Sequence, residues 1–115
     1  MTFTTLVEAL RHQVTERPDA VALVAESIDR PRSISWRQLG KAVTRVASAL
    51  AKRLDSESAP RRIGYASDNG PGDILIALAS MTIGAIEVPI DHRLGGQQIA
   101  NRWDRVGGLW LDRDF

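Results

Sequence analysis

Residues 84–94 read Gly84-Ala85-Ile86-Glu87-Val88-Pro89-Ile90-Asp91-His92-Arg93-Leu94, and the expected fold can be worked out from this segment in both directions. Gly84 suits the position after a helix, because a residue without Cβ adopts a positive φ at no steric cost. The mainly apolar residues 85–90 predict a short strand. Pro89 has no N–H to donate to a neighbouring strand, so it belongs near the strand end or at a sheet edge. A polar turn follows at residues 91–94.

The segment before Gly84 predicts a helix that is apolar on most of its faces, formed by Ile74, Leu75, Ile76, Ala77, Leu78, Ala79, Met81 and Ile83. Such a helix suits a position against a sheet, with another element covering it. The turn at residues 67–73 precedes this helix, and it supplies Asn69 or Gly70 as the helix cap and Asp73 at the positive helix end.

Two capping boxes mark helices in the N-terminal half. Thr5 with Glu8 begins a helix over about residues 6–16, and Ser35 with Gln38 begins the clearest amphipathic helix of the chain. The apolar residues of that second helix fall at helical spacing and are Leu39, Val43, Val46, Ala47, Leu50 and Leu54. Between the two helices, residues 20–25 predict a buried strand, which residues 33–35 pair with as a hairpin.

The C-terminal half alternates strands with helices. Strands are expected at residues 62–66, 85–90 and 109–112, and helices at residues 74–83 and 97–106 connect them. Two such crossovers imply a parallel sheet with right-handed connections. We therefore predict one α/β domain or subdomain over residues 1–115, with a partly parallel sheet and packed helices.

Composition narrows the class of protein. The chain has 15 Lys and Arg against 14 Asp and Glu, so no global field favours nucleic acid or an anionic membrane. No signal peptide is expected, and the least polar run, residues 74–86, is shorter than the roughly 20 residues that a membrane span needs. The sequence has no Cys, which fits a cytoplasmic protein, and His12 and His92 lack the spacing of metal ligands.

Residues 78–91 read Leu-Ala-Ser-Met-Thr-Ile-Gly-Ala-Ile-Glu-Val-Pro-Ile-Asp and resemble a segment of the AMP-forming adenylating enzymes. In that superfamily the segment commonly runs from a small-residue helix through Lys-Ala-Gly-Ala to Val-Pro-Leu/Ile-Asp or Asn. Its members include acyl-CoA and aryl-CoA synthetases, nonribosomal-peptide adenylation domains and luciferases. Here Thr82-Ile83 replaces the usual Lys-Ala, and Glu87 replaces a common aromatic residue.

Further segments carry the same resemblance. Residues 17–24, Arg-Pro-Asp-Ala-Val-Ala-Leu-Val, are similar to the opening strand of those synthetases. Residues 35–39 keep the aromatic position of a Thr/Ser-Tyr-x-Glu-Leu motif, and Asn69 matches a frequent turn asparagine. The resemblance runs from about residue 6 to residue 112. It implies the fold of the N-terminal subdomain of AMP-forming acyl-CoA synthetases.

The resemblance also implies an activity for the parent family. Its members use ATP and Mg²⁺ to convert a carboxylate to an acyl-adenylate, and then form a thioester with CoA or a carrier protein. This sequence lacks their phosphate loop ending in Pro-Lys-Gly, their aromatic-Gly-x-x-Glu motif, the ribose-binding Asp and the C-terminal catalytic Lys. Our first hypothesis is therefore an N-terminal fragment that is inactive alone. It would have no catalytic or metal-binding residue and no cofactor of its own, and its partner would be the remainder of the synthetase.

Arg93 is the one site residue that the resemblance suggests. In acyl- and aryl-CoA synthetases the turn after the strand often reads Asn-x-Arg-Leu, which residues 91–94 match at Arg93 and Leu94. The match implies that Arg93 lies where these enzymes contact CoA phosphates, a role that suits a guanidinium fork. On sequence grounds alone we favour a surface ion pair or a helix cap for this residue.

Two other features have both a plain and a functional interpretation. The loop Gly70-Pro71-Gly72 precedes a helix, as phosphate-binding loops do, but helix capping explains it better because Asp73 occupies the positive end. A stripe of cations lies on the polar side of the long helix, and we favour a solvated face over phosphate binding for it. Its members are Arg37, Lys41, Arg45 and Lys52.

A second hypothesis is a binding module, a small α/β protein that kept the fold, lost the chemistry and pairs with itself or another subunit. The lack of an evident covering layer over the helix of residues 74–83 favours it, because an exposed apolar face invites a partner. A third hypothesis, a small flavodoxin-like nucleotide binder that uses the Gly70 loop, ranks below both.

Overall fold

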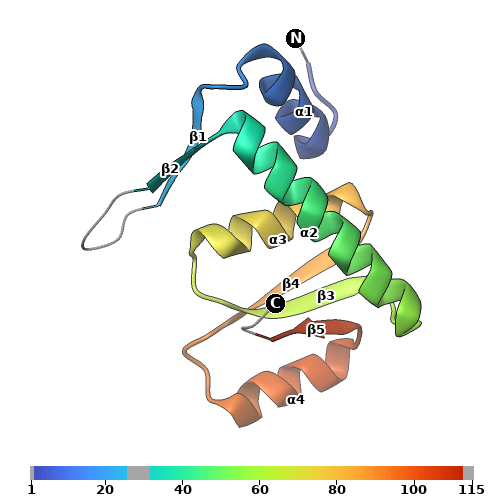
Figure 1. The fold of residues 1–115 in the computed structure, drawn as a ribbon. Helices are drawn as coiled ribbons and strands as arrows, with labels where there is room; N and C mark the ends of the chain where they lie inside the picture. The colour runs from blue at the N-terminus through green and yellow to red at the C-terminus, as the bar shows by residue number, and fades with distance from the viewer. Residues whose placement is uncertain (1, 26–31, 113–115) are drawn as a thin grey trace.

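The computed structural model describes residues 2–25 and 32–112 (Figure 1). The elements follow the order α1 (Leu6–Glu16), β1 (Val21–Ala25), β2 (Arg32–Ser35), α2 (Trp36–Ser56), β3 (Arg62–Ser67), α3 (Pro71–Thr82), β4 (Ile86–Asp91), α4 (Gly96–Val106) and β5 (Leu109–Leu111). Every helix and strand expected from the sequence is present. The prediction of a mixed α/β fold is therefore confirmed.

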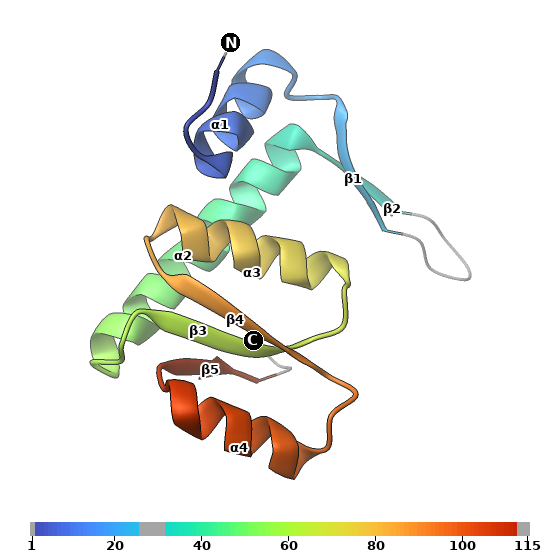
Figure 2. The same ribbon diagram turned by 180° about the vertical axis from the view of Figure 1, so that it is seen from behind.

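The centre of the fold is a parallel sheet with the strand order β4-β3-β5. Tyr65 in the middle strand pairs with Pro89 on one side and Leu111 on the other. The chain moves from β3 to β4 in one direction and then passes β3 in the other direction to form β5. Two crossovers of one hand that run in opposite directions place their helices on opposite faces. Figures 1 and 2 show this arrangement, with α3 on one face and α4 on the other.

A second helical layer lies over α3. The long helix α2 packs across α3, and α1 contacts both helices. The buried face of α2 is the one predicted from its spacing and consists of Leu39, Val43, Ala47, Leu50 and Leu54. The expectation that residues 74–83 lack a covering layer is therefore wrong, because α2 provides one. Ile74 and Met81 nevertheless stay exposed at its edges.

The first strand corrects another expectation. Residues 20–25 were expected to form a buried strand, yet Val21 is 59% exposed and Val24 is 55% exposed. The predicted hairpin is present, since β1 and β2 pair antiparallel, but these two strands form a sheet of their own. It extends away from the main body in Figure 1, so no described element covers its outer face.

The helix caps follow the sequence closely. At α2 the capping box is complete, because Gln38 N donates to Ser35 Oγ at 3.2 Å and Ser35 N donates to Gln38 Oε1 at 2.9 Å. At α1, Glu8 N donates to Thr5 Oγ1 at 3.1 Å. At the end of α3, Gly84 has φ +68°, the positive angle expected of it.

Close packing between β3 and α4 depends on a glycine. A Cβ on Gly64 would lie 2.4 Å from Cζ3 of Trp103, so the indole rests directly on the strand backbone. Trp103 also lies beside Trp110 of β5, with ring centroids 5.5 Å apart. These contacts hold α4 against its face of the sheet.

Candidate functional site

The candidate site lies at the carboxyl ends of β3 and β4, the edge where parallel α/β sheets bind ligands. Ser67 and Asp91 are paired at these ends. The turn after β4 folds back onto β3, because His92 N donates to Ser67 O at 3.0 Å and His92 Nδ1 lies 2.9 Å from the same oxygen. A cavity of about 450 Å³ opens here, lined by Ser67, Asn69, Pro89, Asp91, His92 and Arg93.

Arg93 is held by the carboxylate of Asp91. Its Nη2 donates to Asp91 Oδ2 at 2.7 Å and its Nε to Asp91 Oδ1 at 3.1 Å, while its backbone N donates to Oδ1 at 2.9 Å. These bonds from the Arg93 side chain and backbone hold the pKa of Asp91 well below its ordinary range. The same pairing raises the pKa of Arg93. The structure thus shows the surface ion pair that the sequence favoured for this residue.

The loop between β3 and α3 is closed by its own carboxylates. Asp73 Oδ2 accepts bonds from Ser67 Oγ at 2.5 Å and from Asn69 N at 3.0 Å. Asp68 Oδ1 accepts a bond from Gly70 N at 2.8 Å. Since these acids take up loop amides and lie at the positive end of α3, the capping interpretation fits the loop better than phosphate binding.

A hydrogen-bonded pair of buried Tyr65 and half-buried Glu87 lies deeper in the sheet, and no sequence pattern predicted it. Tyr65 Oη donates to Glu87 Oε2 at 2.8 Å. Burial, followed by this hydrogen bond, raises the pKa of the Tyr65 phenol well above its ordinary value. The strand register explains the contact. Glu87 pairs with Ile63, and Ile63 and Tyr65 are two residues apart in β3, so all three side chains lie on the same face of the sheet. The contact between Tyr65 and Glu87 could therefore be predicted only once the register of β3 against β4 was known.

A second cavity of about 540 Å³ lies beside the first and is rich in carboxylates, with Asp68, Asp73 and Asp112 among its lining residues. In the parts of the chain that the structure describes, no three His, Cys, Asp or Glu side chains come together as metal ligands could. His12 lies apart in α1, with its ring centroid 5.2 Å from that of Phe3. The site can therefore hold a polar ligand through Arg93 and His92, but its other charges are negative.

Replacing Arg93 by glutamine should let the pKa of Asp91 rise toward the ordinary range of an aspartate. The guanidinium bonds are the largest cause of the lowering, whereas the backbone bond at 2.9 Å remains in the variant. An NMR pH titration of the Asp91 carboxyl carbon measures the change. Arg102→Gln on α4 is the control and should leave that titration unchanged, and an unshifted Asp91 in Arg93→Gln would contradict the pairing.

None of the helices within the described residues is both long enough and apolar enough to cross a membrane. The family model described as AMP-binding enzyme matches residues 10–107. The chain is also 37% identical over 90 residues to the fatty acid–acyl-carrier-protein ligase MmaC of Mycobacterium marinum, a match that covers 78% of this chain and 16% of that protein. The chain thus spans about a sixth of the length of this relative.

Solved structures agree with this match. The acetoacetyl-CoA synthetase from Streptomyces lividans superposes with a TM-score of 0.70 at 21% identity, over 87% of this chain and 15% of that one. A fatty acyl-adenylate ligase from L. pneumophila, solved with acyl adenylate and pyrophosphate, superposes with a TM-score of 0.64 at 23% identity, over 78% and 16% of the two chains. This chain belongs to the AMP-binding enzyme family and corresponds to the N-terminal part of these AMP-forming adenylating enzymes.

Proposed function

We propose that this chain is the N-terminal segment of an AMP-forming ligase and does not form adenylates by itself. The complete ligase would convert a carboxylate and ATP, with Mg²⁺, to an acyl-adenylate and then to a thioester with CoA or a carrier protein. One observation carries the proposal. The family match extends over residues 10–107, nearly the whole chain, yet the aligned part is only 16% of the length of the Mycobacterium marinum relative.

The packing supports a segment that needs more protein around it. The radius of gyration is 15.3 Å, whereas a compact domain of this length would have about 13 Å. Large apolar side chains remain exposed on β1 and β4, namely Val21, Val24 and Ile86. Contacts with the remainder of a ligase would bury such side chains.

The charges at the carboxyl ends of the strands support the same conclusion. Adenylation requires cations aimed at the phosphates as negative charge is transferred. Arg93 is already paired with Asp91, and Asp68 and Asp73 bring negative charge to the same edge. Phosphates would therefore meet little uncompensated positive charge at this edge in the isolated chain.

The acceptor and the location belong to the proposal as well. A CoA synthetase and an acyl-carrier-protein ligase both share this fold or sequence, so either thiol acceptor suits the complete enzyme. ATP, Mg²⁺ and CoA are proposed cofactors of that enzyme, and Arg93 is our proposed contact for CoA phosphates within it. A cytoplasmic location is inferred from the cysteine-free sequence.

We expect the isolated chain to release no pyrophosphate from ATP with mixed carboxylates, and to show no saturable heat of binding with ATP and Mg²⁺ or with CoA. Calorimetric titration and a pyrophosphate assay measure both. As a positive test, residues 10–107 would replace the matching segment of the Mycobacterium marinum ligase. The hybrid should release pyrophosphate, whereas a version with that segment deleted should not. Turnover by the isolated chain, or an inactive though folded hybrid, would overturn the proposal.

A second function is favoured by the exposed hairpin. A non-catalytic module that pairs with itself or another subunit would explain why Val21 and Val24 face solvent in β1. Light scattering of the purified chain decides the self-pairing form of this alternative. A monomer at high protein concentration would rule out pairing between copies.

A further inference from the structure

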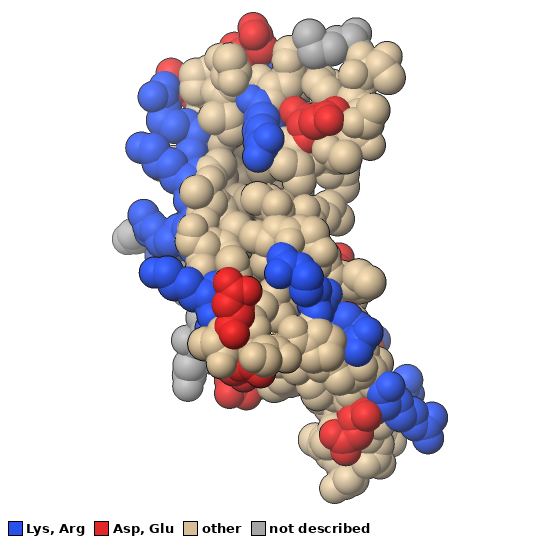
Figure 3. Space-filling view, turned by 90° about the vertical axis from the view of Figure 1, so that its right-hand side faces the viewer, with Lys and Arg blue, Asp and Glu red and all other residues tan. Residues whose placement is uncertain are grey.

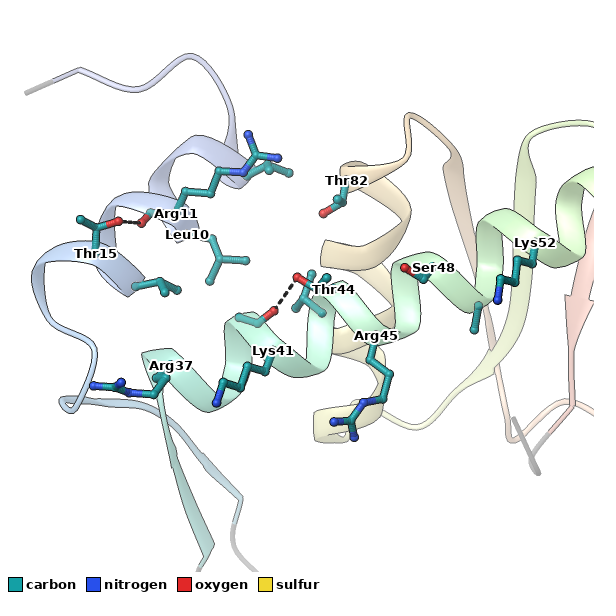
Figure 4. Close-up of a pocket in the computed structure, with 15 residues that line it drawn as sticks. Leu10, Arg11, Thr15, Arg37, Lys41, Thr44, Arg45, Ser48, Lys52 and Thr82 are labelled. Atoms are coloured by element: carbon teal, nitrogen blue, oxygen red, sulfur yellow. Dashed lines mark hydrogen bonds between the residues drawn. The ribbon is translucent and has the colours of Figure 1, made fainter.

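A groove lies between α1 and α2, lined mainly by residues of these two helices (Figure 4). It has a volume of about 1070 Å³, and Thr82 of α3 also lines it. Its floor is apolar and is formed by Val7, Leu10, Val14 and Val43. Gly40 allows the two helices to meet beneath it, since a Cβ there would lie 2.9 Å from Cγ2 of Val14.

The rim of this groove is cationic. The charged residues that line it are Arg11, Arg37, Lys41, Arg45 and Lys52, and no Asp or Glu among the described residues does so. Arg37 is paired with Asp19 at 3.0 Å. Within residues 2–25 and 32–112, no ion pair involves Lys41, Arg45 or Lys52. Figure 3 shows Lys and Arg side chains gathered in a column along one edge of the molecule.

The three cations of α2 that form no ion pair with a described residue lie at helical spacing. Lys41, Arg45 and Lys52 follow one another on α2 at intervals of four and seven residues, which places them on one side of the helix. At a rise of about 1.5 Å per residue, the stripe is roughly 16 Å long. A ligand that satisfies all three cations must therefore carry carboxylates about one helical turn apart for Lys41 and Arg45, and about two turns apart for Arg45 and Lys52.

We propose that this groove binds an acidic amphipathic helix of another protein. Its apolar face would lie on Val7 and Val14, and its Glu or Asp side chains would face Lys41, Arg45 and Lys52. Recognition of this kind combines an apolar anchor line with a charged rim that sets orientation. The proposal does not depend on adenylation, so its test and that of the proposed function are separate.

Other occupants fit less well. A fatty acid has one carboxylate and would leave most of the stripe unused. A flat bilayer would not reach the floor, because Leu10 is only 8% exposed and Val43 only 3%. A single-stranded nucleic acid would need aromatic side chains to stack its bases, and in the described part of the chain none lines the groove.

The probe is a fluorescein-labelled synthetic peptide of about 18 residues, long enough for five helical turns, with leucines along one face and glutamates beside them. Fluorescence anisotropy measures its affinity for the chain. We expect Lys41→Glu with Arg45→Glu to weaken binding about tenfold or more, because both opposing charges change sign. Arg102→Glu with Arg105→Glu on α4 is the matched control. It makes the same change in net charge and should leave the affinity unaltered.

Each further outcome decides the proposal. A peptide in which serine replaces every leucine should fail to bind, and equal binding by it would show that the groove floor plays no part. An equal loss of affinity in the α4 control would show that the peptide responds to the net charge of the chain and not to the groove. Preferential binding to phosphatidylglycerol vesicles, or a dimer that dissociates when Lys41 and Arg45 are reversed, would replace the acidic helix by a membrane or by a second copy. Any of these four results would overturn the proposal.

Discussion

Leu50→Ala should lower the free energy of unfolding by about 2–5 kcal/mol. Leu50 is 0% exposed and sits on the face of α2 that packs across α3, within the core that also includes Ile63 and Leu109. Truncation would remove buried methyl groups and leave a cavity between layers that are close-packed on all sides. The free energy of unfolding of such domains is only about 5–15 kcal/mol, so this single substitution would remove a large part of it.

Urea unfolding followed by tryptophan fluorescence measures this change. Leu6→Ala is the matched control, because Leu6 is 61% exposed at the start of α1 and its truncation should cost at most about 0.5 kcal/mol. If both variants unfolded at the same urea concentration, α2 would not form the layer over α3 that the structure shows.

The same contrast explains which parts of the fold could be predicted. Leu50 was assigned to the inner face of its helix because helical spacing shows which side is apolar. Spacing does not show what covers that side, and therefore the position of α2 over α3 was missed. The apolar composition of β1 likewise indicated burial, although its only described partner strand is β2 and its outer face stays open.

The candidate site divides in the same way. The pairing of Arg93 with Asp91 joins residues two apart in one turn, so a surface ion pair could be proposed from sequence. The bond of Tyr65 to Glu87 joins β3 to β4, and the contact of His92 with Ser67 joins the turn after β4 to β3. Both depend on the register of β3 against β4, which no local pattern specifies.

The need for glycine at residue 108 also arises from distant packing. Gly107 follows α4 directly and has φ +75°, as a glycine after a helix end can. At Gly108 the constraint is different, because a Cβ would lie 2.4 Å from the backbone oxygen of Arg62. That oxygen belongs to β3, the strand with which β5 pairs, so the glycine sets how closely these strands approach.

Gly108→Ala should therefore destabilise the chain by about 3 kcal/mol or more, the sum of backbone strain and overpacking. Gly108 has φ +130°, a conformation that costs a residue with a Cβ. The atom in the way belongs to the backbone, so no rotamer change relieves the clash. Relief requires β5 to move away from β3, which breaks the pairing of Ile63 with Leu109 and the contact of Trp110 with Trp103.

Unfolding in urea measures the loss, and near-ultraviolet circular dichroism of the tryptophan pair reports whether β5 has shifted. Gly72→Ala is the control, because nothing lies within 4 Å of a Cβ there and the residue is in the first turn of α3. This control should stabilise the chain by about 0.5–1 kcal/mol through the lower backbone entropy of alanine in the unfolded state. Opposite signs for the two glycines would show that close approach, rather than glycine content, fixes the position of β5. Two small effects of the same sign would contradict a close approach of β5 to β3 at Gly108.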